Sequence, residues 1–163
     1  MHAKKYGIET EALHAIREQQ DAIVDKLFSK DMLAAQLGDV ESFLHTSGME
    51  LLRRYLQAYL DNRTRQEPRL SAVRNSEGFD LTHCREGCQR NLESRFGTVI
   101  FRKKIYSLPE QGSVFPLDAE LNLPPDKYSH ELRRLSAKES AKQSFDDVVE
   151  FLDTMTGRHI PKR

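Results

Sequence analysis

The sequence predicts an α+β fold in which helical segments flank a central antiparallel β-ribbon. Three observations predict it: apolar residues recur at helical spacing over residues 10–65, they alternate along residues 97–106, and helix-capping residues follow residue 128. The expected organisation is a helical N-terminal region at 1–66, a basic β-ribbon at 67–108, an extended linker at 109–128, and a helical unit at 129–163.

Two helices are expected in the N-terminal region. The apolar stripe of the first runs from Leu13 to Leu27 at intervals that suit one helix face. The second is expected to begin at Ser47, because Glu50 lies three residues on and would complete a capping box. Their apolar faces can pack on each other, which is the favoured arrangement, or on a second copy of the chain. The pattern is too short to indicate a coiled coil.

Two hairpins are expected in the ribbon. Ser76-Glu77-Gly78 is a turn between two extended segments, and Phe96-Gly97 is a second turn, with Gly97 suited to a positive φ. On the strand after Gly97, alternation is expected to place Val99, Phe101 and Ile105 in the core. The opposite face would then present Arg102 and Lys104 beside Tyr106.

Two further helices are expected after the proline-rich segment "LPEQGSVFPLDAELNLPPDKYS". Ser129 caps the first, which runs to about Lys142. Ser144 caps the second, and Asp146 and Asp147 lie in its first turn, where the helix dipole favours carboxylates. Gly157 would end that helix, and Pro161 would occupy the first position of a third, truncated one. This outline is that of a helix-turn-helix unit, although small helical bundles share it.

The distribution of charge says more than its total. The 25 basic and 25 acidic residues cancel, but residues 1–52 carry −4, residues 53–104 carry +6, and residues 105–163 carry −2. A basic middle third suits either a polyanion-binding surface or a solvated arginine-rich exterior. No apolar run is long enough to span a membrane and no signal peptide is evident, so no membrane partner is expected. With only two cysteines, the sequence indicates a cytoplasmic protein.

No cofactor, metal site or catalytic residue is expected. His83, Cys84 and Cys88 lack the second ligand pair that structural zinc needs, so free thiols are the favoured interpretation. The carboxylates clustered at 146–153 lie on one short helix, where dipole and solubility explain them better than two-metal catalysis. Phosphate-binding and nucleophile-elbow motifs are absent from the sequence.

Residues from about 50 to 163 resemble the N-terminal half of bacterial insertion-sequence transposases of the ISKra type. The matching positions are Thr82-His83, Arg85, Gly87, Leu92, Phe96-Gly97, Val99, Tyr106, Leu121-Asn122-Leu123-Pro124, Tyr128-Ser129-His130, Leu132-Arg133-Arg134-Leu135 and Ser144-Phe145-Asp146-Asp147. The resemblance implies a DNA-cutting enzyme whose three metal-binding carboxylates lie on a ribonuclease-H-like core. That catalytic DDE domain would lie downstream of the region present here, so this chain is expected not to be an enzyme.

The resemblance implies binding to double-stranded DNA at transposon terminal repeats. The candidate DNA-binding residues are Arg90, Arg95, Arg102, Lys103, Lys104, Arg158, Lys162 and Arg163. Such a chain would modulate transposition by occupying the repeats or by pairing with intact transposase. The alternatives are a protein-interaction module that assembles through its N-terminal helices, or a remnant without DNA binding.

Overall fold

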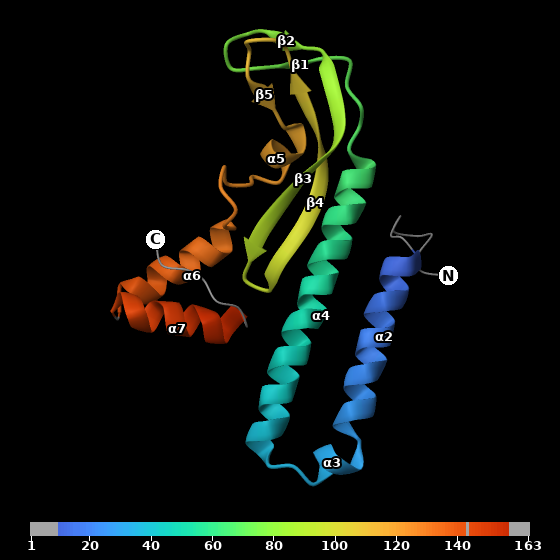
Figure 1. Cartoon of the computed structure of the whole chain (residues 1–163), viewed down its shortest axis with the longest axis vertical. Helices are drawn as coiled ribbons and strands as arrows, with labels where there is room; N and C mark the ends of the chain where they lie inside the picture. The colour runs from blue at the N-terminus through green and yellow to red at the C-terminus, as the bar shows by residue number, and fades with distance from the viewer. Residues whose placement is uncertain (1–9, 143, 157–163) are drawn as a thin grey trace.

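The computed structural model of the chain describes residues 10–142 and 144–156, and it confirms the α+β fold. A long helical hairpin lies beside a β-ribbon, and a separate pair of helices follows the ribbon (Figure 1). Within the described residues the strands form a two-stranded sheet, β1-β2, and a three-stranded sheet, β3-β4-β5.

The N-terminal hairpin consists of α2 (Thr10–Leu27), the short α3 (Lys30–Leu33) and α4 (Leu37–Gln66). Figure 1 shows α2 running antiparallel to α4, with α3 at the end that projects away from the ribbon. Among residues 11–27 of α2, Ile16 alone is fully buried, because α2 packs mainly on α4, whereas α4 also packs on the ribbon. The expected intramolecular pairing of two helices is therefore confirmed.

The prediction that the second helix begins at Ser47 is wrong, because α4 begins at Leu37 and Ser47 lies inside it. Glu50 does not reach back to Ser47. Its carboxylate accepts hydrogen bonds at 2.7 and 2.8 Å from Arg53 and at 3.0 Å from Arg54. These bonds, led by that from Arg53, lower the pKa of Glu50 to about 2, so the group is ionised at neutral pH. The Ser-x-x-Glu pattern that suggested a capping box therefore lies in the helix interior, where its glutamate forms ion pairs.

Both predicted turns are confirmed. β1 (Val73–Arg74) pairs with β2 (Asp80–Leu81) across a turn in which Gly78 has a φ of 89°. β3 (His83–Ser94) pairs with β4 (Gly97–Ser107) through a two-residue loop, and Gly97 has the expected positive φ, at 108°. The pairing register of the two strands shifts between Arg85 and Cys88, where β3 carries a bulge.

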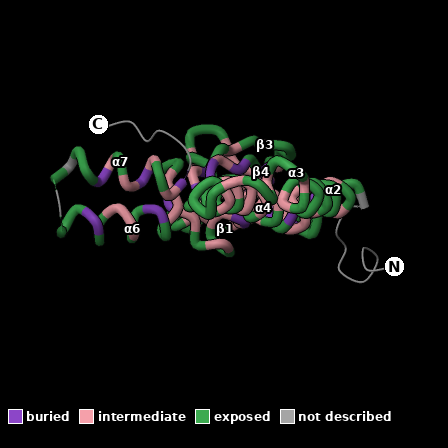
Figure 2. The backbone as a smooth tube through the Cα atoms, turned by 90° about the horizontal axis from the view of Figure 1, so that it is seen from below, coloured by how far each residue is buried: buried purple, intermediate pink, exposed green. Residues whose placement is uncertain are grey.

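One face of the β3-β4 hairpin forms the main core with α4 and α5 (Pro116–Glu120). Its buried members come from four elements and are Leu60, Leu92, Val99, Phe101 and Leu117. Buried stretches of the chain occur both where α4 meets the strands and in the α6-α7 part (Figure 2).

Polar side chains of α4, and Glu67 directly after it, bond to the backbone of β4 along the part of its edge that β5 does not cover. The side-chain amide of Gln57 accepts from the Ile100 N–H at 2.9 Å and donates to the carbonyl of the same residue. The Thr64 hydroxyl donates to the Arg102 carbonyl at 2.5 Å. The carboxylate of Glu67 accepts at 2.9 Å from the backbone N–H two residues further along β4. The helix thus satisfies groups that a neighbouring strand would otherwise bond.

The segment at 109–128 is not the extended linker that the sequence predicted. β5 (Ser113–Val114) adds a short third strand to β4, and α5 follows directly. Leu117 of α5 is 1% exposed in the main core, and Leu121 and Leu123 pack against that core. The prolines mark ends of short elements here, and the apolar residues between them bind the segment to the ribbon.

The last two helices are α6 (His130–Ser140) and α7 (Phe145–Thr156), and both predicted caps are confirmed. The Ser129 hydroxyl accepts from the Leu132 N–H, and Ser144 and Asp147 cap each other reciprocally. Leu132, Val148 and Leu152 form a small core between the two helices. Gly157, Pro161 and the expected third helix lie outside the described residues.

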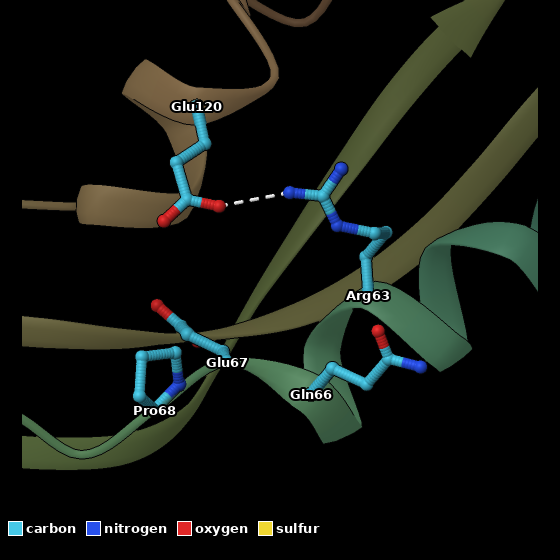
Figure 3. Close-up of a pocket in the computed structure, with 5 residues that line it drawn as sticks. All are labelled: Arg63, Gln66, Glu67, Pro68 and Glu120. Atoms are coloured by element: carbon cyan, nitrogen blue, oxygen red, sulfur yellow. Dashed lines mark hydrogen bonds and ion pairs between the residues drawn. The ribbon is translucent and has the colours of Figure 1, made fainter. Parts of the chain in front are cut away.

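A pocket of about 390 Å³ lies where α4 meets α5, lined by Arg63, Gln66, Glu67, Pro68 and Glu120. Figure 3 shows Arg63 and Glu120 facing each other there, with an ion pair at 2.8 Å. Glu67 is 7% exposed, and burial raises the pKa of its carboxyl above the ordinary 4.5.

A raised pKa in the folded state means that protonation of Glu67 favours folding. The benefit is complete below pH 4.5 and is lost as the pH rises through the folded-state pKa. Glu67→Gln keeps an oxygen acceptor without the buried charge, so we expect a higher free energy of unfolding at pH 7 and no gain below pH 4.5. Urea denaturation at several pH values measures this. Glu77→Gln, in the exposed β1-β2 turn, should change nothing, and a loss of stability at pH 7 in Glu67→Gln contradicts the account.

Candidate nucleic-acid interface

Two of the ribbon cations predicted to contact DNA are instead structural. Arg90 pairs with the Asp118 carboxylate at 2.8 Å and also donates to the carbonyls of Pro124 and Asp126. Lys103 is 6% exposed, and its ammonium group bonds to the same Asp118 oxygen. Lys103 lies two residues beyond Phe101 on β4, so the alternation of the strand turns it toward the core. Both side chains therefore hold α5 and the following segment against the ribbon.

The predicted basic face of β4 is also smaller than expected. Tyr106 is fully buried, and its hydroxyl accepts a hydrogen bond from the Leu70 N–H at 2.8 Å. Burial raises the pKa of the Tyr106 phenol. The Lys104 ammonium is half-buried and donates to the Glu67 carbonyl at 2.9 Å. The reason is that the chain following α4 covers this end of the ribbon's outer face.

Arg102 and Arg95 are the two predicted ribbon residues that remain exposed. Arg102 pairs in register with Gln89 on the outer face, away from the main core. Arg95 lies in the loop between β3 and β4, where its guanidinium is 5.7 Å from the centre of the Phe96 ring. The other three predicted residues, Arg158, Lys162 and Arg163, lie outside the described residues.

An exposed basic row on α6 was missed by the sequence reasoning. His130, Arg134 and Lys138 are spaced four residues apart, lie on one side of the helix and are all exposed. The four-residue repeat of basic residues after Ser129 was the available signal. We call these three residues the α6 basic row; its histidine adds charge only when protonated.

Arg95 lies close to the start of this row, because it lines one cavity together with His130 and Glu131. The Glu131 carboxylate pairs with Arg134 at 2.8 Å, and these hydrogen bonds lower its pKa, with a smaller contribution from the charge of Arg95. The hairpin loop and the first turn of α6 thus form one surface. Its positive charge comes from two elements far apart in the sequence, which is why no single stretch revealed it.

The other candidate chemistries gain no support from the geometry. Cys84 and Cys88 are free thiols, and residues 10–142 and 144–156 contain no group of three side chains placed to hold a metal ion. The Asp147 carboxylate accepts at 2.6 Å from the Ser144 hydroxyl and so serves as a capping partner. Among the described helices, none is both long and apolar enough to cross a membrane.

Comparison of the chain with protein-family models, with curated proteins and with solved structures found no match.

The structural role assigned to the Asp118 cluster can be tested by comparing its stability contribution with that of an exposed cation. Asp118→Ala leaves the buried ammonium of Lys103 without its carboxylate, and we expect a loss of about 3–5 kcal/mol in the free energy of unfolding. Arg102→Ala removes an exposed charge, and we expect a change within about 0.5 kcal/mol. Chemical denaturation followed by circular dichroism measures both. Equal, small effects would contradict the structural role of the cluster.

Proposed function

We propose that this chain is the DNA-binding, N-terminal portion of an insertion-sequence transposase of the ISKra type, and that it binds DNA rather than cutting it. The observation that carries the proposal is the α6 basic row beside Arg95, on a capped two-helix unit with its own small core. Arginine and lysine side chains make many of the contacts by which DNA-binding proteins hold phosphate oxygens. The ordered sequence resemblance over residues 50–163 supports the same assignment.

The proposed contacts are mainly to phosphates. Arg95, Arg134 and Lys138 are long cationic side chains on one surface, and Arg102 adds a fourth on the outer face of the ribbon. Phosphate contacts orient a protein on DNA but carry no sequence information directly. We therefore propose weak binding by these residues, with a dissociation constant on the order of 10⁻⁴–10⁻⁶ M at physiological salt. Occupying terminal repeats in this way would modulate transposition.

The test is a binding titration across a salt series, with terminal-repeat duplex of an ISKra-type element and a scrambled duplex. Four phosphate contacts predict a slope of log K against log salt of about −3.6, and Arg134→Ala with Lys138→Ala should reduce it to about −1.8. The control is Arg17→Ala with Lys26→Ala, which removes the same charge from α2, away from the α6 surface.

The two duplexes separate the outcomes. Tighter binding to the repeat places specificity within this chain, whereas equal binding leaves a purely electrostatic contact. Absence of binding to both duplexes, or an equal loss of slope in the α2 control, would overturn the proposal.

A protein-interaction module that does not touch DNA is the second candidate. The observation that favours it is the set of exposed apolar side chains along the N-terminal hairpin, several of them large. The same titration distinguishes the two candidates, because an interaction module would bind neither duplex.

A further inference from the structure

A row of apolar side chains runs along one side of α4 and remains exposed. Its members are between 41% and 73% exposed, and they are Leu37, Leu44, Leu52, Tyr55 and Tyr59. Intervals of seven, eight, three and four residues place them on one helix face. We call them the α4 apolar row. Single exposed apolar residues are ordinary, but several large ones on one helix face mark an interaction surface.

Gly48 lies in the middle of this row, and the packing of the described chain does not require it. A glycine inside a helix costs about 1 kcal/mol relative to alanine. A Cβ atom added at Gly48 would meet nothing within 4 Å. A small residue at the centre of an apolar face has a clear use when a second helix crosses there, because it lets the two backbones approach closely.

The row is self-complementary about Gly48. In an antiparallel two-fold crossing centred there, residues equally far on either side of position 48 face each other. Leu44 then meets Leu52 of the second copy, and Leu37 meets Tyr59 of the second copy. Between these pairs, Glu41 faces Tyr55 of the second copy, whose hydroxyl can donate to the carboxylate. A second copy of this chain fits the row on both chemistry and spacing.

The far end of the row offers a recess for the most exposed member. Tyr59 borders a cavity of about 400 Å³ whose lining includes the apolar Leu56 and Phe96 and, on its polar side, Arg95 and His130. Leu37, at 73% exposed, is the residue that the crossing brings to this cavity. An isologous interface needs a projecting side chain at one end of the surface and a matching recess at the other, and Leu37 and the cavity beside Tyr59 supply these two parts.

The area of the row reaches the threshold for a pair. The exposed parts of these residues amount to about 500 Å² per copy, so a two-fold contact that covers them fully buries about 1,000 Å², the area that a biological interface is expected to reach. From the row, the glycine and the self-complementarity, we infer that α4 pairs two copies of this chain by an antiparallel crossing at Gly48. This inference goes beyond the proposed DNA binding and does not depend on it.

Sedimentation equilibrium of the full chain over a range of concentrations tests the pairing. We expect a dimer for the unaltered chain, and at least a tenfold higher dissociation constant for Gly48→Leu and for Leu52→Ser. Phe79→Ser is the matched control, because Phe79 is 46% exposed in the β1-β2 turn, far from α4, and should leave the dimer unchanged. Circular dichroism confirms that each variant is folded, and Gly48→Ala provides a helix-favouring substitution if Gly48→Leu fails to fold.

A cysteine at position 48 tests the geometry. In a Cys84→Ser, Cys88→Ser background, Gly48→Cys should form a disulfide between copies under mild oxidation, since the two-fold axis brings position 48 against itself. Ser42→Cys, also exposed on α4 but on another side, should not. A chain that is monomeric at all concentrations overturns the inference, as does a dimer that survives both interface substitutions or fails to cross-link through position 48. The salt-series titration is read separately, so either proposal can fail alone.

Discussion

The arrangement of this protein depends on the contact between α4 and the open edge of β4. Gln57 and Thr64 of α4, and Glu67 directly after it, bond to the backbone of alternate residues of one strand. This contact satisfies a strand edge that would otherwise be free to pair with another chain. It also fixes the direction of α4 along the ribbon, so that Leu60 enters the core beneath Val99 and Phe101. The remainder of α4 then projects beyond the ribbon as an arm.

The buried Asp118 cluster has a different role. By bonding to both Arg90 and Lys103, it ties α5 to two strands at once, and Arg90 extends the connection to the segment that leads into α6. A buried ion cluster is seldom a large source of stability, but removing one member leaves an uncompensated charge. Its consequence for function is that two basic residues of the ribbon are withdrawn from solvent, and the exposed positive charge moves to α6 and the hairpin loop.

The two proposed surfaces follow different helices and adjoin at the cavity beside Tyr59, whose lining includes Arg95 and His130. The α6 basic row belongs to the C-terminal helical pair, whereas the α4 apolar row follows the N-terminal hairpin. A pair of copies joined through α4 would carry two copies of the proposed DNA-binding unit. Linking two weak binding units raises their combined affinity through effective concentration, without any new contact to DNA. Weak contacts by one chain and pairing of two chains are therefore compatible parts of one account.

The sequence by itself determined the local elements: the helical N-terminal hairpin, the turns at Gly78 and Gly97, and the caps at Ser129 and Ser144. These features depend on neighbouring residues, through spacing, backbone freedom and capping bonds. What only the tertiary structure decided was which side chains face solvent. Lys103, Arg90 and Tyr106 are kept from solvent by partners distant in the sequence. His130, Arg134 and Lys138 form one basic surface with Arg95 because Arg95 lies beside their helix. Alternation along a strand gives two faces, but only packing against α4, α5 and the chain between them selects which is covered.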